Sequence, residues 1–118
     1  MKQGSIPINK DFELQYRYFD KDPEFKYFNR KFEIYLLEKK NLKKNYVLHI
    51  DNCDTSPGKW SPHIHKAPNV NKKLYFGVST LNWNDVKNNF LECIVETVGE
   101  PQREHVKKAI SKLISPKI

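Results

Sequence analysis

The sequence of 118 residues predicts an α+β fold for a single domain, residues 1–118, with an antiparallel sheet of about four strands followed by two C-terminal helices. Two observations predict this fold class. In several segments before about residue 78, apolar side chains alternate with polar ones at the period of a half-buried strand. Beyond that point, apolar side chains recur every three or four residues, which is typical of amphipathic helices. Strands first and helices after is the order of an α+β chain.

Four segments carry the alternation that predicts a strand. They are residues 11–19, 31–38, 46–50 and 74–78. The second and third of these have the pattern of a hairpin, with a lysine-rich turn at residues 39–45 that we expect to be solvated. Residues 1–10 show little periodicity, so we expect a flexible N-terminal arm there.

The last third of the chain predicts two helices. The first is expected to run from Trp83 to about Thr97, because Gly99 stops it. Pro101 stands where the first turn of the second helix tolerates proline, and Pro116 ends that helix. The stripes expected to face the core are Trp83, Val86, Phe90, Ile94 and Val98 in the first helix, and Val106, Ile110, Leu113 and Ile114 in the second.

The composition predicts a small cytoplasmic protein. Apolar residues make up 38% of the chain and aromatic residues 13%, which is enough for a core without disulfides. Cys53 and Cys93 form no paired motif, so we expect reduced thiols. No apolar run approaches the roughly 20 residues of a membrane span, and no signal peptide is evident, so no membrane contact is expected.

The charge and the missing motifs narrow the function classes. A formal net charge of +7 favours an acidic partner such as nucleic acid or an acidic protein, although it also favours solubility. The sequence contains no phosphate-binding glycine loop, no GxSxG elbow, no HExxH helix and no paired cysteine motif. These absences exclude P-loop nucleotide hydrolysis and serine hydrolase chemistry.

The residues from Asp51 to His65 need a chemical rather than a structural explanation. They lie within residues 51–72, whose prolines and irregular pattern predict a long loop, with a short extended piece around Ile64. Long loops in small domains often carry function. Four polar, reactive side chains are concentrated in this stretch: Asp51, Asn52, His63 and His65.

His63 and His65 predict acid–base chemistry. Side chains at i and i+2 of an extended backbone point to the same face, so both imidazoles could act on one substrate. Imidazoles ordinarily titrate near pH 6.5, so one can accept a proton while the other donates one. Cleavage of RNA without a metal or other cofactor needs such a pair. Asp51 could orient a histidine, while Lys66 or Arg17 could supply a cation for the developing phosphate charge.

Other interpretations remain open for the same residues. A His-x-His in a polar loop is often only solvated. A metal-dependent nuclease could use His63, His65 and Asp51 as ligands, with His49 and Asp54 as further candidates. We otherwise expect His49 and His105 to be structural.

A non-catalytic, basic module that binds nucleic acid or protein is the main alternative to an endoribonuclease, ahead of a metal-dependent nuclease. Trp60 could stack on a base, although it could also pack the loop against the sheet. Aromatic residues alternating with basic ones suit an RNA-binding sheet, but they also build cores. The side chains expected to contact nucleic acid are Arg17, Asn52, Lys59, Trp60 and Lys66.

The order of motifs over about residues 31–95 resembles the TumE-type toxins of bacterial and archaeal toxin–antitoxin systems. The chain differs from that pattern in its long, proline-containing loop and in its additional N-terminal strand and C-terminal helix. The segments that carry the resemblance are Asp51-Asn52, Gly58, His63-Ile64-His65, Tyr75-Phe76 and Asp85 to Phe90.

The resemblance implies a small toxin that is paired with a cognate antitoxin protein. Together with the histidine pair, it leads us to expect a toxin-like, metal-independent endoribonuclease that acts on RNA. A homo-oligomer is a further candidate assembly.

Overall fold

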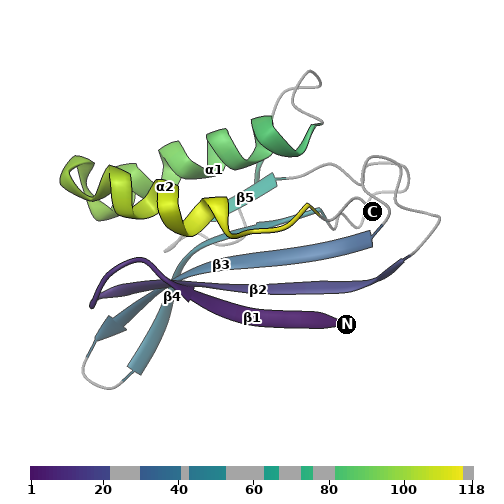
Figure 1. Ribbon diagram of the computed structural model, residues 1–118, viewed down its shortest axis with the longest axis horizontal. Coiled ribbons are helices and arrows are strands. Elements are labelled where there is room, and N and C mark those ends of the chain that lie inside the picture. The colour runs from purple at the N-terminus through teal and green to yellow at the C-terminus, as the bar shows by residue number, and fades with distance from the viewer. Residues whose placement is uncertain (22–29, 41–42, 53–62, 67–72, 76–81, 116–118) are drawn as a thin grey trace.

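Two layers, a sheet and a pair of helices, make up the described part of the chain (Figure 1). The computed structural model describes residues 1–21, 30–40, 43–52, 63–66, 73–75 and 82–115, and for residues 21, 63, 66 and 73–75 it describes the backbone alone. The elements in chain order are β1 (Lys2–Pro7), β2 (Phe12–Lys21), β3 (Arg30–Lys40), β4 (Lys43–Asp51), β5 (His63–Lys66), β6 (Lys73–Tyr75), α1 (Trp83–Val98), the 3-10 helix η1 (Glu100–Gln102) and α2 (Arg103–Ser111).

The described strands form one six-stranded sheet in the order β1-β2-β3-β4-β5-β6. Every neighbouring pair is antiparallel, so each strand lies beside the strand that follows it in the chain. The pairing of β3 with β4 shifts between Leu36 and Leu37, because Leu36 lies opposite Leu48 whereas Leu37 lies opposite Tyr46. This bulge brings Tyr46 to the same face of the sheet as His49.

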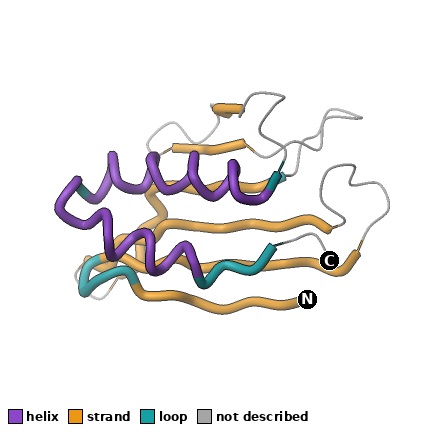
Figure 2. The backbone as a smooth tube through the Cα atoms, turned by 45° about the horizontal axis from the view of Figure 1, so that its top comes forward, coloured by secondary structure: helices purple, strands orange, loops and turns teal. Residues whose placement is uncertain are grey.

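Helix α1 begins and ends at residues suited to those positions. The Asn82 side chain accepts a hydrogen bond of 2.8 Å from the backbone N–H of Asp85, which satisfies a donor that the first turn leaves unpaired. Gly99 ends the helix with a φ of 106°, a value that residues with a Cβ rarely adopt. The chain then passes through η1 into α2, and Figure 2 shows both helices on the same side of the sheet.

The core lies between the helices and one face of the sheet, which we call the helix face. Because side chains alternate along a strand, each strand contributes every second residue to this face. The fully buried side chains include Tyr18 and Phe32 from the sheet and Phe90 from α1. The other side chains with less than 2% exposure and large volume are Leu14, Ile34, Leu36, Leu48, Ile50, Ile64 and Ile94.

The structure confirms the predicted α+β class, with an antiparallel sheet followed by two C-terminal helices. The N-terminal arm expected over residues 1–10 is instead largely strand β1, which pairs with β2 along its whole length. The hairpin strands β3 and β4 also extend into the expected turn, as far as Lys40 and from Lys43. The expected core position of Ile114 is wrong, since 45% of that residue is exposed.

Neither helix of the described chain has both the length and the apolar character that crossing a membrane requires. Cys93 lies partly buried in α1, whereas Cys53 lies outside the described residues.

Candidate functional site

The face of the sheet opposite the helices carries polar and aromatic side chains, and we call it the polar face. Residues paired directly across neighbouring strands share a face. Two such rows cross the sheet at the polar face. The first is Gln15, Tyr35, His49 and His65, from β2 to β5, and the second is Arg17, Glu33 and Asp51, from β2 to β4.

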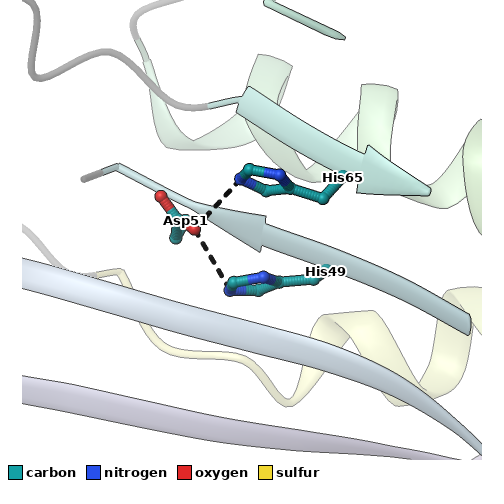
Figure 3. Close-up of side chains that lie close together, drawn as sticks. All are labelled: His49, Asp51 and His65. Atoms are coloured by element: carbon teal, nitrogen blue, oxygen red, sulfur yellow. Dashed lines mark ion pairs between the residues drawn. The ribbon is translucent and has the colours of Figure 1, made fainter. Parts of the chain in front are cut away.

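Two histidines and one aspartate meet on the polar face (Figure 3). The Nε2 atom of His49 lies 3.2 Å from Oδ2 of Asp51, and the Nε2 atom of His65 lies 3.5 Å from the same oxygen. The two imidazole rings are stacked, with centroids 5.2 Å apart and an angle of 20° between their planes. We call these three residues the His49–Asp51–His65 cluster.

The strand pairing explains why these three side chains converge. His49 and Asp51 are two residues apart on β4, so they point to the same face. His65 lies opposite His49 on the neighbouring strand β5. The contact therefore depends on the pairing of β4 with β5, two strands that are separated by residues 52–62 in the chain.

The cluster is well shielded from water. Side-chain exposure is 8% for Asp51, 15% for His49 and 13% for His65. A carboxylate that has lost most of its water needs hydrogen bonds or positive charge to remain ionised. An imidazolium at 3.2 or 3.5 Å from Oδ2 can provide that positive charge.

Two tyrosines fix the position of the His49 ring. The Tyr35 ring stacks on it at 4.2 Å with an angle of 9°, so the imidazole lies between Tyr35 and His65. The Tyr46 ring meets the Tyr35 ring and the His49 ring edge to face, with centroids 5.6 Å apart in each pair. These contacts restrict rotation of the imidazole and hold it toward Asp51.

The same tyrosines remain protonated at neutral pH. Burial, followed by the charge of Glu33 and a hydrogen bond to it, raises the pKa of Tyr35 to about 12. That hydrogen bond runs from the Tyr35 hydroxyl to Oε2 of Glu33 over 3.3 Å. Burial, followed by the charge of Asp51, also raises the pKa of Tyr46.

A group of charged residues continues the polar face beside the cluster. Glu33 lies 3.8 Å from an Arg17 guanidinium nitrogen and 3.4 Å from the Lys31 ammonium. Both cations also lie over the ring of Phe19, at 5.5 Å for Arg17 and 4.6 Å for Lys31. Arg17, a predicted source of the cation, thus lies on the same face as Asp51. Glu33 partly neutralises Arg17 and lies between it and Asp51 in the row.

The cluster also has the composition of a metal site. Among the described residues, one ligand atom each from His49, Asp51 and His65 lies within 4.8 Å of the other two. Two imidazoles and one carboxylate form a ligand set used by zinc and other first-row transition metals. Such a set leaves coordination positions for water or substrate.

Two of the three predicted catalytic residues, Asp51 and His65, are brought together by the structure. The backbone of His63 is paired with Asp51, but its side chain lies outside the described residues. The role predicted for His63 therefore stays a prediction. The partner that the structure places beside His65 is His49.

Asn52 has a structural position, contrary to its predicted contact with nucleic acid. Its side chain has 0% exposure. The amide oxygen accepts a hydrogen bond of 2.8 Å from the backbone N–H of Phe32, and the amide nitrogen donates one of 2.9 Å to the carbonyl of Arg30. A buried amide bonded in this way holds the start of β3 against the end of β4.

The remaining predicted nucleic-acid contacts have no described side chains. Lys59 and Trp60 lie outside the described residues, as does the metal-ligand candidate Asp54. Lys66 is the last residue of β5, where its backbone is paired with Leu48, and its side chain is not described.

His49 was expected first to be structural and was named only as a further metal-ligand candidate, whereas the structure places it in the cluster. A signal for it exists, because His49 and Asp51 are two residues apart on a strand and so share a face. His105 differs, for it is exposed on α2 with its Nδ1 atom 3.0 Å from Oε1 of Gln102.

Comparison with known proteins identifies no relative, since no family model, no curated protein and no solved structure matches the chain. The resemblance to TumE-type toxins therefore stays a prediction. The case for a function depends on the geometry of the polar face.

Proposed function

We propose that the protein is a toxin-like endoribonuclease that cleaves RNA at the His49–Asp51–His65 cluster. The observation that carries this proposal is the convergence of two imidazoles on one oxygen of the shielded Asp51 carboxylate. A net charge of +7 suits a polyanionic substrate.

Acid–base catalysis without a metal is the first mechanism for this cluster. A neutral imidazole accepts the proton of a ribose 2′-hydroxyl, and the 2′-oxygen attacks the adjacent phosphorus. The bond from phosphorus to the 5′-oxygen breaks, and an imidazolium donates a proton to that oxygen. The products are a 2′,3′-cyclic phosphate and a 5′-hydroxyl. Asp51 supports this chemistry because one of its oxygens lies 3.2 Å from Nε2 of His49 and 3.5 Å from Nε2 of His65, so it can orient both imidazoles.

A metal-dependent nuclease is the second candidate, and the spacing of the ligand atoms favours it. The separations of 3.2 and 3.5 Å from Asp51 Oδ2 to the two Nε2 atoms suit ligands about 2.0–2.2 Å from a shared cation. A metal bound there would activate water for attack on phosphorus. His49, Asp51 and His65 would then act as ligands rather than as acid and base.

Incubation of the purified protein with total RNA, with and without EDTA, tests the proposal and separates the two mechanisms. We expect cleavage to persist in EDTA, with products that end in a 2′,3′-cyclic phosphate. Loss of cleavage in EDTA, and its recovery when zinc or manganese is added in excess, would favour the metal-dependent mechanism. RNA binding without any cleavage would contradict both mechanisms and favour a binding module.

An Asp51→Asn variant identifies the site of cleavage. It keeps the size of the side chain but removes the charge, so we expect the cleavage rate to fall about 10²- to 10⁴-fold. Asp20→Asn is the matched control, because Asp20 is exposed and pairs with the N-terminal amine. Cleavage by a folded Asp51→Asn protein at the wild-type rate would rule out the proposed site.

His63→Ala tests the predicted role of the third histidine. If His63 belongs to the acid–base pair, this variant will lose cleavage to the same extent as His65→Ala. If His49 and His65 form the pair, His63→Ala will retain most of the activity whereas His49→Ala will not.

Under this proposal the cellular partners are RNA and an antitoxin protein that masks the polar face. Co-expression with the reading frame next to the gene should relieve growth inhibition caused by the wild-type protein. An Asp51→Asn protein should not inhibit growth even when it is expressed alone.

A further inference from the structure

A hollow of about 560 Å³ lies on the polar face, beside the His49–Asp51–His65 cluster. Its volume is within the range of roughly 300–1,000 Å³ that is usual for small-molecule sites. The side chains that line it include Gln3, Ser5, Gln15, Arg17, Tyr35 and Tyr46, from strands β1 to β4.

We propose that this hollow is a subsite for a nucleobase of single-stranded RNA, next to the bond that is cleaved. The inference rests on the proposed function, because it assigns the substrate-binding region of the same site. It goes further by naming the groups that would recognise the base.

Tyr35 and Tyr46 connect the hollow to the cluster. Both line the hollow, and both are in contact with the His49 ring, with Tyr35 stacked on it at 4.2 Å. A ligand in the hollow is therefore one aromatic ring away from the imidazoles. That separation suits a nucleotide whose base lies in the hollow while its phosphate reaches toward the cluster.

The chemistry of the hollow matches that of a base. Aromatic rings such as those of Tyr35 and Tyr46 provide stacking surfaces, and stacking is the usual way that proteins hold single-stranded bases. The amides of Gln3 and Gln15 each offer a donor and an acceptor, which can pair with the edge of a base. Arg17 adds a cation that can contact a neighbouring phosphate.

Polar groups at the edge of the hollow are also accessible to a ligand. Gln3 and Ser5 on β1 are exposed, which makes these polar groups available to a ligand.

The test measures binding of a short, fluorescently labelled 2′-O-methyl RNA, which lacks the 2′-hydroxyl and is not cleaved. The same backbone without bases at its central positions serves as the comparison ligand. Fluorescence anisotropy gives the dissociation constant of wild-type protein for each. We expect the ligand without bases to bind about tenfold more weakly.

Two sets of variants separate base recognition from phosphate contact. In Gln3→Ala/Gln15→Ala, affinity for the complete RNA should fall about threefold and the preference for it should become smaller, because stacking on Tyr35 and Tyr46 remains. In Arg17→Ala, affinity for both ligands should fall equally and the salt dependence should become shallower. Asn88→Ala and Lys108→Ala, at exposed positions of the two helices, should bind like wild type.

Unchanged affinity and preference in the glutamine double variant would overturn the subsite. If wild type still cleaves RNA in that case, the proposed function survives while the inference fails. If the double variant has a smaller base preference but wild type cleaves no RNA, the subsite stands and the catalytic proposal falls. A double variant that binds RNA normally but changes its oligomeric state would overturn the subsite and assign the hollow to a second copy of the chain.

Discussion

The two faces of the sheet differ sharply, although they are built from the same strands. Ile34, Ile50 and Ile64 lie side by side on β3, β4 and β5, and each is at most 1% exposed. The residues next to them in sequence form the row of Tyr35, His49 and His65 on the polar face. A shift of one residue in pairing would exchange the two rows. The helix face provides stability and the polar face is available for chemistry, so substitutions on each should affect different quantities.

The largest expected effect on stability is at the helix face. Leu14 has 0% exposure, and Leu14→Ala should lower the free energy of unfolding by about 2–5 kcal/mol, because it removes buried methyl groups and leaves a cavity. Gln15→Ala, at the adjacent position on the polar face, should change it by less than about 0.5 kcal/mol. Urea denaturation of both variants measures the difference. Equal losses would contradict the division of roles between the faces.

The next effect concerns Asn52, which stabilises the fold although it directly follows Asp51 of the cluster in sequence. Asn52→Ala removes the buried hydrogen bond to the N–H of Phe32 and the partly buried one to the carbonyl of Arg30. We expect a loss of about 1–3 kcal/mol in the free energy of unfolding. Thermal and urea unfolding measure this loss, and Asn88→Ala on the exposed side of α1 is the control. A neutral Asn52→Ala would show that the amide is not structural.

A similar loss is expected at Gly99, which allows the chain to pass from α1 to α2. With φ at 106° and ψ at 145°, this residue occupies a region that is open almost only to glycine. Gly99→Ala should therefore reduce the free energy of unfolding by about 1–3 kcal/mol. The substitution is remote from the cluster, so the folded variant should keep wild-type cleavage. Unchanged stability would mean that the turn can relax to another conformation.

The smallest effect is a pH dependence from the polar face. The pKa of Tyr35 is raised to about 12, so an unfolded chain, with an ordinary pKa near 10, loses this proton first. The stability that follows from this difference is present below about pH 10 and is lost as the pH rises toward 12. Urea unfolding at several pH values should thus show a shallower decline for Tyr35→Phe than for wild type. Parallel curves would contradict the environment described for Tyr35.

The sequence was sufficient to predict the fold class, because the periods of strands and helices are local. Strand β1 escaped prediction because Ile6 is its single buried residue, so its pattern is too weak to identify. It is held instead by pairing with β2, which is a tertiary effect.

The site was predictable only in part, because it also depends on tertiary pairing between strands. Asp51 and His65 could be chosen by residue type, but their contact depends on the pairing of β4 with β5. His49 shares its strand with Asp51, yet its selection over other histidines requires knowing that His65 lies opposite it. Asn52 was misassigned because burial of a polar residue at a strand end cannot be read from local sequence.

We propose that the protein cleaves RNA on its polar face, at the His49–Asp51–His65 cluster. The most direct measurement is the rate constant for cleavage of one defined RNA by folded His65→Ala protein, compared with wild type and with His105→Ala. We predict a fall of about 10²- to 10⁴-fold for His65→Ala and no change for His105→Ala, whose histidine lies on the exposed surface of α2. Cleavage by folded His65→Ala protein at the wild-type rate would contradict the claim.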